Sequence, residues 1–369
     1  MLADSTLTRT PLFLELSARW LLGSGIREAG GGVARYYLAS ERRNKPVSTE
    51  ITGYAASTFA FLARETGESE YRDAAVSSAR FLVKAAWQEE LQAFPFELAS
   101  PAEPAPRPCY FFDCGIIIRG LLAVWRLTGE ENLLAMAVKA GRVMAGDFLT
   151  DAAIHPILSL PSKKPLPYDH DRWSRVPGCY QLKSAMAWLD LERITGEEAF
   201  GRYFDRALQM ALASHGSFLP GNQDVEKVMD RLHAYCYFLE ALLPVAGRPE
   251  AAAALQSGMP LTAHLLREIA PRFSRSDVYA QLLRIRLYAD ALGAMPLDRT
   301  AAAEEAAAIP LFQREDPDPR IHGGFYFGQK QGRLLPFVNP VSTAFGLQAL
   351  CQWRRYQTGE FQSDTEALI

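Results

Sequence analysis

Three carboxylates occupy positions in the sequence where acid–base chemistry is possible. Glu50 lies in "VSTEITGY", Asp113 follows three aromatic residues in "YFFDCG", and Asp230 begins "DRLHAY". Burial among aromatic side chains would raise the pKa of Asp113, which suits a catalytic acid. The simpler interpretation is that Glu50 and Asp113 merely stabilise helix N-termini. A pair of such carboxyl groups is what a glycoside hydrolase requires, and the sequence leaves both interpretations open.

A histidine and a tyrosine offer a second kind of chemistry. In "MDRLHAYCYFLEAL", Asp230 and His233 are three residues apart, and His233 and Tyr237 are four apart. In a helix they therefore share one face. An imidazole beside a carboxylate and a phenol suits the proton transfers of a lyase or a sugar epimerase.

Charged and aromatic residues are densest in "YDHDRWSRV", residues 168–176. This interleaving indicates the lining of a ligand pocket, although a solvated loop would also contain such charges. His322 precedes "GGFYFG", whose glycines permit close approach of a ligand but serve a turn equally well. The predicted ligand-binding residues of the whole chain are Tyr54, Phe112, His170, Arg172, Trp173, Arg175, Arg231, His322 and Asn339.

Arginine side chains near these positions raise the question of ligand charge. A guanidinium group binds a carboxylate or phosphate in two places, so such arginines favour an anionic ligand, most simply a uronic acid. Alternatively, each arginine pairs with a nearby aspartate (Asp171, Asp230, Asp277 or Asp316) and braces a loop. The arginines concerned are Arg172, Arg175, Arg231, Arg275 and Arg314.

The composition excludes several classes of protein. The chain has 369 residues, of which 49% are hydrophobic and 22% charged, as in ordinary globular proteins. A net charge of −3 provides no basic field for nucleic acid. No apolar run is long enough to span a bilayer, and the N-terminus lacks a signal-peptide pattern. Because the five cysteines follow no disulfide pattern, we expect a cytoplasmic protein; its oligomeric state is left open.

Patterns for metals and nucleotide cofactors are missing from the sequence. There is no zinc spacing such as Cys-x2-Cys or His-Glu-x2-His, and Asp169 and Asp171 form only an Asp-x-Asp pair. Neither a P-loop nor a dinucleotide-binding glycine motif occurs. We therefore expect neither a metal nor a cofactor.

A repeated junction indicates which elements position these residues. "RETGESE", "RLTGEEN", "RITGEEA" and "YQTGEF" each end a helical pattern at Thr-Gly-Glu. Glycine tolerates the positive φ of a helix C-terminus, and the acidic residues that follow favour the start of the next helix. Two less regular copies complete six helix–turn–helix units. The six glycines are Gly67, Gly129, Gly196, Gly247, Gly293 and Gly359.

The apolar periodicity then places the helices, and strand alternation is nearly absent, so an all-α protein is expected. We also expect the N-terminal helix to pack beside the last inner helix, and a single domain over residues 1–369. The predicted inner helices are 51–65, 114–127, 174–194, 230–246, 277–292 and 341–357. The predicted outer helices are 11–24, 70–87, 131–149, 199–215, 249–269 and 299–308.

This pattern resembles the (α/α)6 toroid of the six-hairpin glycosidase-like superfamily. Three stretches, "STEITGYAASTFAFL", "YFFDCGIIIRGLLAVWRLTGEENLLAMAVKAGR" and "GGFYFG…PFVNPVSTAFGLQAL", are similar to its polysaccharide-biosynthesis (VpsJ-type) branch. The resemblance implies that the N-termini of the inner helices face one end of the toroid. The loops entering them would then form the working face, as loops on a rigid scaffold often do. These loops are 88–113, 150–173, 216–229 and 309–340.

The resemblance implies a carbohydrate-active protein with a saccharide ligand. The first hypothesis is glycoside hydrolysis by Glu50 or Asp113 together with Asp230. The second is a lyase or epimerase that uses His233 and Tyr237. The third is a non-catalytic glycan-binding component of polysaccharide biosynthesis, which needs no carboxylate pair. The residues expected to line one cavity are Glu50, Asp113, Arg175, Asp230 and His233.

Overall fold

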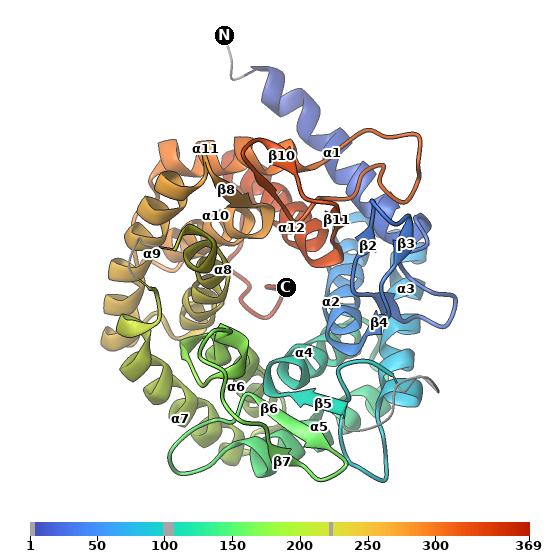
Figure 1. Ribbon diagram of the computed structural model, residues 1–369, viewed down its shortest axis with the longest axis vertical. Helices are drawn as coiled ribbons and strands as arrows, with labels where there is room; N and C mark the ends of the chain where they lie inside the picture. The colour runs from blue at the N-terminus through green and yellow to red at the C-terminus, as the bar shows by residue number, and fades with distance from the viewer. Residues whose placement is uncertain (1–3, 99–106, 221–223) are drawn as a thin grey trace. The chain divides into compact units, whose positions relative to one another are not determined.

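The computed structural model of the protein describes residues 4–98, 107–220 and 224–369. Parts of two expected loops, residues 99–106 and 221–223, lie outside the described residues. Helices make up most of the described residues (Figure 1). The α-helices are α1 (Asp4–Gly23), α2 (Thr49–Thr66), α3 (Ser69–Phe81), α4 (Phe111–Thr128), α5 (Glu131–Phe148), α6 (Leu182–Thr195), α7 (Glu198–Ser214), α8 (Val225–Leu242), α9 (Pro249–Ile269), α10 (Ser276–Ala291), α11 (Arg299–Ala308) and α12 (Pro340–Thr358).

The chain divides into two compact units. We call Glu28–Arg35 with Pro46–Phe218 the carboxylate unit, because it contains Glu50 and Asp113. Met1–Arg27, Tyr36–Lys45 and Leu219–Ile369 form the histidine unit, which contains His233. The expectation of a single domain stays a prediction.

In the carboxylate unit, α4 packs against both α2 and α6. Each of these three helices also packs against the helix that follows it, so α3, α5 and α7 lie on their other side (Figure 1). Glycines allow the close approach of the inner helices. A Cβ atom on Gly115 would lie 2.3 Å from the Ser184 carbonyl oxygen, and one on Gly120 would lie 2.5 Å from that of Gly53. Larger residues at these two positions would force α4 away from α6 or α2.

In the histidine unit, α10 packs against α8 and α12. The helices α9 and α11 pack against α8 and α10, respectively. The N-terminal helix α1 packs against α12, as the sequence predicts. The order of inner and outer helices is therefore the same in both units.

The Thr-Gly-Glu junctions end helices in the way that the sequence predicts. Gly67, Gly129 and Gly196 have φ = 73°, and Gly359 has φ = 77°. The threonine also contributes: the Thr66 hydroxyl donates to the Leu62 carbonyl at 2.9 Å and accepts from the Glu68 N–H at 3.1 Å. This links the end of one helix to the start of the next, and the junctions at residues 128–130 and 195–197 repeat it.

The two less regular junctions differ from each other. Gly293 has φ = 71°, like the glycines of the regular copies. Gly247 does not adopt positive φ, because α8 ends in a 3-10 turn, Leu243–Val245, that contains Pro244. A proline there lacks the N–H that another α-helical turn would need.

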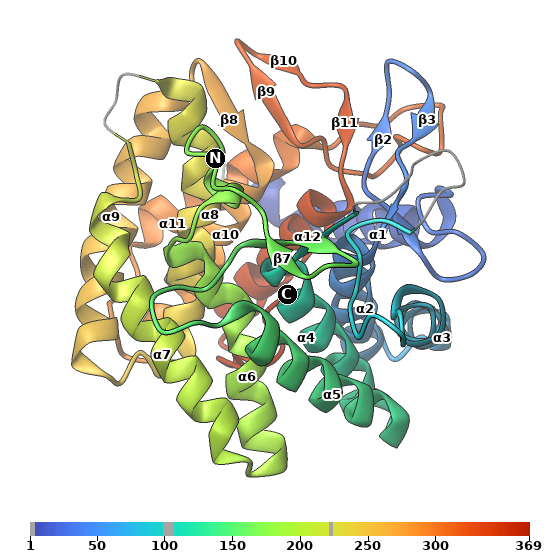
Figure 2. The same cartoon turned by 60° about the horizontal axis from the view of Figure 1, so that its bottom comes forward.

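Short antiparallel sheets, which the sequence analysis did not detect, lie in the connecting loops. Strands of two to four residues are too short to show alternation. In the carboxylate unit, β1 (Val33–Ala34) pairs with β4 (Val47–Ser48), and β5 (Arg107–Tyr110), β6 (Ile157–Leu160) and β7 (Lys164–Pro165) form a sheet. In the histidine unit, β8 (Phe273–Arg275), β9 (Gly328–Lys330) and β10 (Arg333–Leu334) form one sheet, and β2 (Tyr37–Leu38), β3 (Arg43–Asn44) and β11 (Phe337–Val338) form another (Figure 2).

These strands fix where inner helices begin. The strands β4, β5 and β8 run directly into α2, α4 and α10, and β11 is separated from α12 only by Asn339. Hydrogen bonds between paired strands hold the backbone just before each of these helices, so they also hold its first turn in place. None of the described helices is sufficiently long and apolar to cross a membrane.

Three predicted helix starts were wrong, and the first is that of the N-terminal helix, which begins at Asp4 rather than at residue 11. The third inner helix begins at Leu182 rather than at residue 174, after 3-10 turns at Trp173–Arg175 and Cys179–Gln181. Pro177 between them disfavours helical geometry in the residue before it. The fourth begins at Val225 rather than at residue 230, because Asp224 caps it by accepting from the Lys227 N–H at 3.1 Å.

Candidate active site

Glu50 and Asp113 occupy the first turns of the neighbouring helices α2 and α4 in the carboxylate unit. Neither residue is the helix cap. The Ser48 hydroxyl caps α2 by accepting from the Ile51 N–H at 3.4 Å, and the cap position of α4 is Tyr110, which makes no side-chain cap bond. Neither carboxyl group is therefore a cap, although both lie in first turns, where the helix dipole favours negative charge.

Both carboxyl groups have raised pKa values. Asp113 is only 3% exposed, and burial, followed by the charges of Glu50 and Cys109, raises its pKa well above the usual range. Its Oδ2 atom has no hydrogen-bond partner among the described residues. Glu50 is half-buried, and burial raises its pKa to about 7, although Arg35 acts in the opposite direction. Both carboxyl groups therefore hold a proton more readily than ordinary carboxyl groups do, which is the property that a proton donor needs.

Aromatic and cationic side chains surround this carboxyl pair, defined as Glu50 and Asp113. The Tyr110 ring lies 5.3 Å from that of Phe96. Burial and then the charge of Asp113 raise the pKa of Tyr110, Glu50 raises it further, and Arg175 and Arg172 lower it. Tyr110 is thus within electrostatic reach of the carboxyl pair and of both arginines.

A further cation lies on the Glu50 side of the pair. The Arg35 guanidinium forms an ion pair with Glu97 at 3.4 Å and lies 5.5 Å from the centre of the Phe96 ring. The sequence analysis missed Arg35, Phe96 and Glu97, which come from loops without a motif. It included Tyr110 only as one of the three aromatic residues before Asp113.

The stretch 168–176 is mixed in its exposure and its contacts, and its role as a pocket lining stays a prediction. His170 and Arg172 are exposed, and Arg172 lies 3.8 Å from Asp169. Trp173 packs edge-on against Tyr180 with ring centres 5.0 Å apart, and Phe112 lies 6.2 Å from the same ring. Arg175 is half-buried, and Tyr54 of α2 is buried. The charges of Arg175 and Arg172 act on Tyr110, the residue at the cap position of α4.

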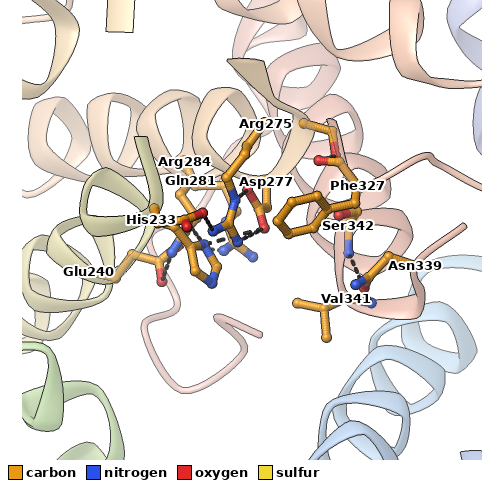
Figure 3. A network of polar contacts seen from close by, with 12 residues as sticks. His233, Glu240, Arg275, Asp277, Gln281, Arg284, Phe327, Asn339, Val341 and Ser342 are labelled. Atoms are coloured by element: carbon orange, nitrogen blue, oxygen red, sulfur yellow. Dashed lines mark hydrogen bonds and ion pairs between the residues drawn. The ribbon is translucent and has the colours of Figure 1, made fainter. Parts of the chain in front are cut away.

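His233 forms a separate cluster in the histidine unit (Figure 3). Its Nδ1 atom lies 2.7 Å from Gln281 Oε1 and 3.4 Å from Asp277 Oδ2, and its ring centre is 4.4 Å from that of Tyr237. Asp230 and His233 lie on the second and third turns of α8 because the helix starts earlier than predicted. We call His233, Arg275, Asp277 and Gln281 the histidine cluster.

Arg275 joins Asp230 to this cluster. It binds Asp277 in two places, Nε to Oδ1 at 3.0 Å and Nη2 to Oδ2 at 2.7 Å, and its Nη1 donates to Asp230 Oδ1 at 3.0 Å. Its guanidinium also lies 4.2 Å from the centre of the Phe327 ring. For Arg275 the bracing interpretation therefore holds, and Asp230, whose side chain is 48% exposed, is an ion-pair partner.

Charges in the histidine cluster lower rather than raise the carboxylate pKa. Burial alone would raise the pKa of Asp277, but Arg275 and His233 outweigh it, and the net change is downward. Burial lowers the pKa of His233 to about 4, although Asp277 opposes this. At neutral pH, Asp277 is therefore a carboxylate and His233 a neutral imidazole.

The remaining candidates of the histidine unit have local contacts. His322 Nδ1 accepts from the Asp316 N–H at 3.3 Å, which fits a turn. Asn339 caps α12, since its side-chain oxygen accepts from the N–H groups of Val341 at 2.8 Å and Ser342 at 3.2 Å (Figure 3). Arg231 is half-buried. Arg314, of the arginine set, donates to the Gln313 carbonyl at 3.4 Å.

The five residues expected to line one cavity thus fall into two groups. Glu50, Asp113 and Arg175 belong to the carboxylate unit, and Asp230 and His233 belong to the histidine unit. That all five line one cavity stays a prediction. Within the described ranges, no group of three or more His, Cys, Asp or Glu side chains could hold a metal ion.

The sequence analysis also missed three buried polar residues behind His233. They are Glu240 on α8 and Gln281 and Arg284 on α10, and all three are fully buried. A usable signal existed: "VYAQLLRIRLY" places a glutamine and two arginines in an otherwise apolar inner-helix pattern. A buried polar residue in such a stripe needs a partner, and that need points to a network.

Comparison with known proteins identifies the fold. No protein-family model and no curated protein matches the sequence. Among solved structures, cellobiose 2-epimerase from Spirochaeta thermophila aligns with a TM-score of 0.71 and 14% identity, over 96% of this chain and 99% of that one. Unsaturated glucuronyl hydrolase from Bacillus sp. GL1 aligns with a TM-score of 0.63 and 13% identity, over 93% and 97%.

A GH76 α-mannanase from Bacteroides thetaiotaomicron is similar to the same degree. It aligns with a TM-score of 0.63 and 11% identity, over 95% of this chain and 97% of that one. The closer resemblance to the VpsJ-type branch stays a prediction. The protein has the (α/α)6 toroid fold of these structures, as its helical repeat predicts.

Proposed function

We propose that the protein is a carbohydrate-active enzyme that hydrolyses a glycosidic bond, with Asp113 as the proton donor and Glu50 as the second carboxylate. The observation that carries the proposal is the carboxyl pair: two carboxyl groups on the first turns of adjacent helices, each with a raised pKa. The fold likeness to proteins named as a glucuronyl hydrolase and an α-mannanase supports it. The ligand would be a saccharide, and a cytoplasmic location remains part of the proposal.

The proposed reaction uses the different surroundings of the two carboxyl groups. Asp113 is buried and its pKa is raised, so in its acid form it gives its proton to the leaving oxygen as the bond between this oxygen and the sugar carbon breaks. Glu50, close to Arg35, supplies the carboxylate. It either takes a proton from the attacking water or first bonds to the sugar carbon and is then released by water. In both cases one water is consumed and Asp113 regains its proton.

Turnover of neutral and acidic oligosaccharides in water labelled with heavy oxygen tests this proposal. We expect one labelled oxygen in the new reducing end. We also expect the rate to fall by about 10²–10⁴-fold in Asp113→Asn and in Glu50→Gln, which is the usual contribution of a positioned acid or base. Asp73→Asn, an exposed aspartate of α3, serves as the matched control and should retain full activity.

Two other results would overturn the proposal. Saccharide binding without turnover by the wild type would favour a glycan-binding component. Unlabelled product with its sugar isomerised would favour the second candidate, a sugar epimerase that uses His233 as the base. The neutral imidazole in the histidine cluster favours this second candidate, and exchange of a sugar C–H for solvent deuterium would reveal it.

A further inference from the structure

A chain of hydrogen-bonded side chains leads from His233 into the interior of the histidine unit (Figure 3). Gln281 Oε1 lies 2.7 Å from His233 Nδ1, and Gln281 Nε2 donates to Glu240 Oε2 at 3.5 Å. The other oxygen of Glu240 accepts from Arg284 Nη2. Arg284 in turn donates to Gln348 Oε1 at 2.8 Å and lies 4.1 Å from the centre of the Phe345 ring. Both ends of the Gln281 amide are thus engaged.

The order of donors and acceptors among these side chains follows from their charges. Glu240 is ion-paired with Arg284, and a carboxylate only accepts hydrogen bonds, so the amide nitrogen of Gln281 must face Glu240. The amide oxygen then faces His233. The Asp277 carboxylate, 3.4 Å from the same Nδ1 atom, is a second acceptor there. An imidazole nitrogen between two acceptors must carry the hydrogen.

We propose that Gln281 is a positioning residue that holds His233 in the tautomer with its hydrogen on Nδ1 and Nε2 free to act as a base. Among the described residues, His233 makes its hydrogen bonds through Nδ1, and Nε2 is left without a protein partner. The role of Nε2 as a base rests on the second candidate function, which is proton transfer at a sugar carbon. The tautomer itself does not depend on any reaction.

The charged groups around His233 are consistent with a neutral base. Asp277 and Arg275 come from α10 and the strand before it, and Glu240 lies two turns along α8. Asp277, Glu240 and the bond to Gln281 favour the protonated ring, whereas burial and Arg275 oppose it. Burial is the largest of these influences, so the pKa falls and the ring keeps one hydrogen at neutral pH.

Nitrogen NMR of the full chain, with labelled histidine, tests the inference directly. His233→Gln identifies the His233 signals among those of the six histidines. In the wild type we expect Nδ1 to be protonated and Nε2 to be unprotonated from pH 6 to 8. The test variant is Gln281→Met, which keeps the length of the side chain but accepts no hydrogen bond. Because Asp277 remains as an acceptor near Nδ1 in this variant, we expect a mixture in which the Nε2–H tautomer becomes detectable beside the Nδ1–H tautomer.

Two further variants complete the design. Gln281→Glu keeps an acceptor beside Nδ1, so Nδ1 should stay protonated; its second oxygen faces Glu240 and should hold a proton that bridges the two carboxyl groups. Gln352→Met removes another buried glutamine, which donates to the Tyr288 hydroxyl at 3.0 Å, and should leave the His233 signals unchanged. This variant controls for a general loosening of the fold.

The outcomes separate the positioning role from the function. An Nε2–H tautomer in the wild type, or an unchanged tautomer in Gln281→Met, overturns the inference. If the tautomer shifts as expected and the enzyme isomerises a sugar, kcat should fall in Gln281→Met in proportion to the share of the Nε2–H tautomer, with little change in KM, because the base is wrongly protonated in that share. If the tautomer shifts but no sugar is isomerised, the positioning role stands and the second candidate function fails.

Discussion

The carboxyl pair and the histidine cluster treat buried charge in opposite ways. Around Glu50 and Asp113 few groups favour the ionised form: Asp113 Oδ2 has no hydrogen-bond partner among the described residues, and both pKa values rise. Around Asp277 the guanidinium of Arg275 supplies two hydrogen bonds, and the pKa falls. Burial acts on both, and the supply of donors decides the direction.

This difference indicates which carboxyl groups can take part in a reaction and which only hold neighbouring side chains in place. A buried carboxyl group with few donors holds its proton more readily than an ordinary one and can deliver it, which makes it reactive at a cost to stability. A buried carboxylate that a cation saturates cannot take part in proton transfer, but it fixes the side chains beside it. We therefore assign the proposed hydrolytic chemistry to the carboxyl pair, and a positioning role to most of the histidine cluster.

The largest expected effect is on stability, and it comes from breaking the buried ion pair behind the histidine cluster. Arg284→Met leaves the fully buried Glu240 without its cation. Removing one partner of a buried ion pair typically costs about 3–5 kcal/mol. Urea denaturation should show a loss of this order in the free energy of unfolding. The double variant Arg284→Met with Glu240→Gln should recover much of it, and equal losses in the single and double variants would contradict the argument.

The next largest effect is the loss of folding stability that the carboxyl pair causes when Glu50 ionises. The folded-state pKa of Glu50 is about 7, against a usual 4.5. Below about 4.5 the group is protonated in both states and costs nothing; as pH rises to 7, only the unfolded chain loses its proton, so the folded state loses relative stability. Because a pKa difference of one is worth about 1.4 kcal/mol, Glu50→Gln should be up to about 3 kcal/mol more stable than wild type at pH 8.

The pH dependence provides the control for this prediction. The two proteins should be equally stable near pH 4, which paired urea titrations at pH 4, 6 and 8 would measure. A variant that is less stable than the wild type at pH 8 would mean that Glu50 is partnered like Asp277, and the contrast between the two regions would disappear.

A smaller effect, on ligand binding, distinguishes Arg175 from Arg275. Arg275 is occupied by Asp277 and Asp230, whereas Arg175 lies within electrostatic reach of Tyr110 beside the carboxyl pair. If the saccharide is acidic, Arg175→Ala should weaken its binding by roughly 1.5–3 kcal/mol, the range for hydrogen bonds to charged groups. Calorimetry with an acidic oligosaccharide and its neutral counterpart measures this. Equal losses for both ligands would reject an acidic substrate.

The smallest effect tests whether Asn339 is structural. Its side chain caps α12 through two backbone N–H groups. Asn339→Ala should therefore cost about 1 kcal/mol in unfolding free energy. Activity per folded molecule should not change, which kinetics below the unfolding transition would establish. A loss of saccharide affinity at unchanged stability would instead return Asn339 to the binding site.

Local signals in the sequence were sufficient for most of the helices. The predicted outer helices 249–269 and 299–308 match α9 and α11, because amphipathic periodicity and helix-end residues act over a few neighbouring positions. The same locality explains the failures. Pro177 delays α6 and Asp224 advances α8, and both are local signals that the periodicity outweighed in the prediction.

The sequence by itself determined the helical repeat, the Thr-Gly-Glu junctions and the chemical types of Glu50, Asp113 and His233, since each depends on residues close together along the chain. Only the tertiary structure decided their partners. Arg275 comes 42 positions after His233 and Gln281 lies 48 after it, yet they determine its surroundings. Protonation state depends on burial and on charges a few ångströms away in space, and no spacing along a single sequence specifies those distances.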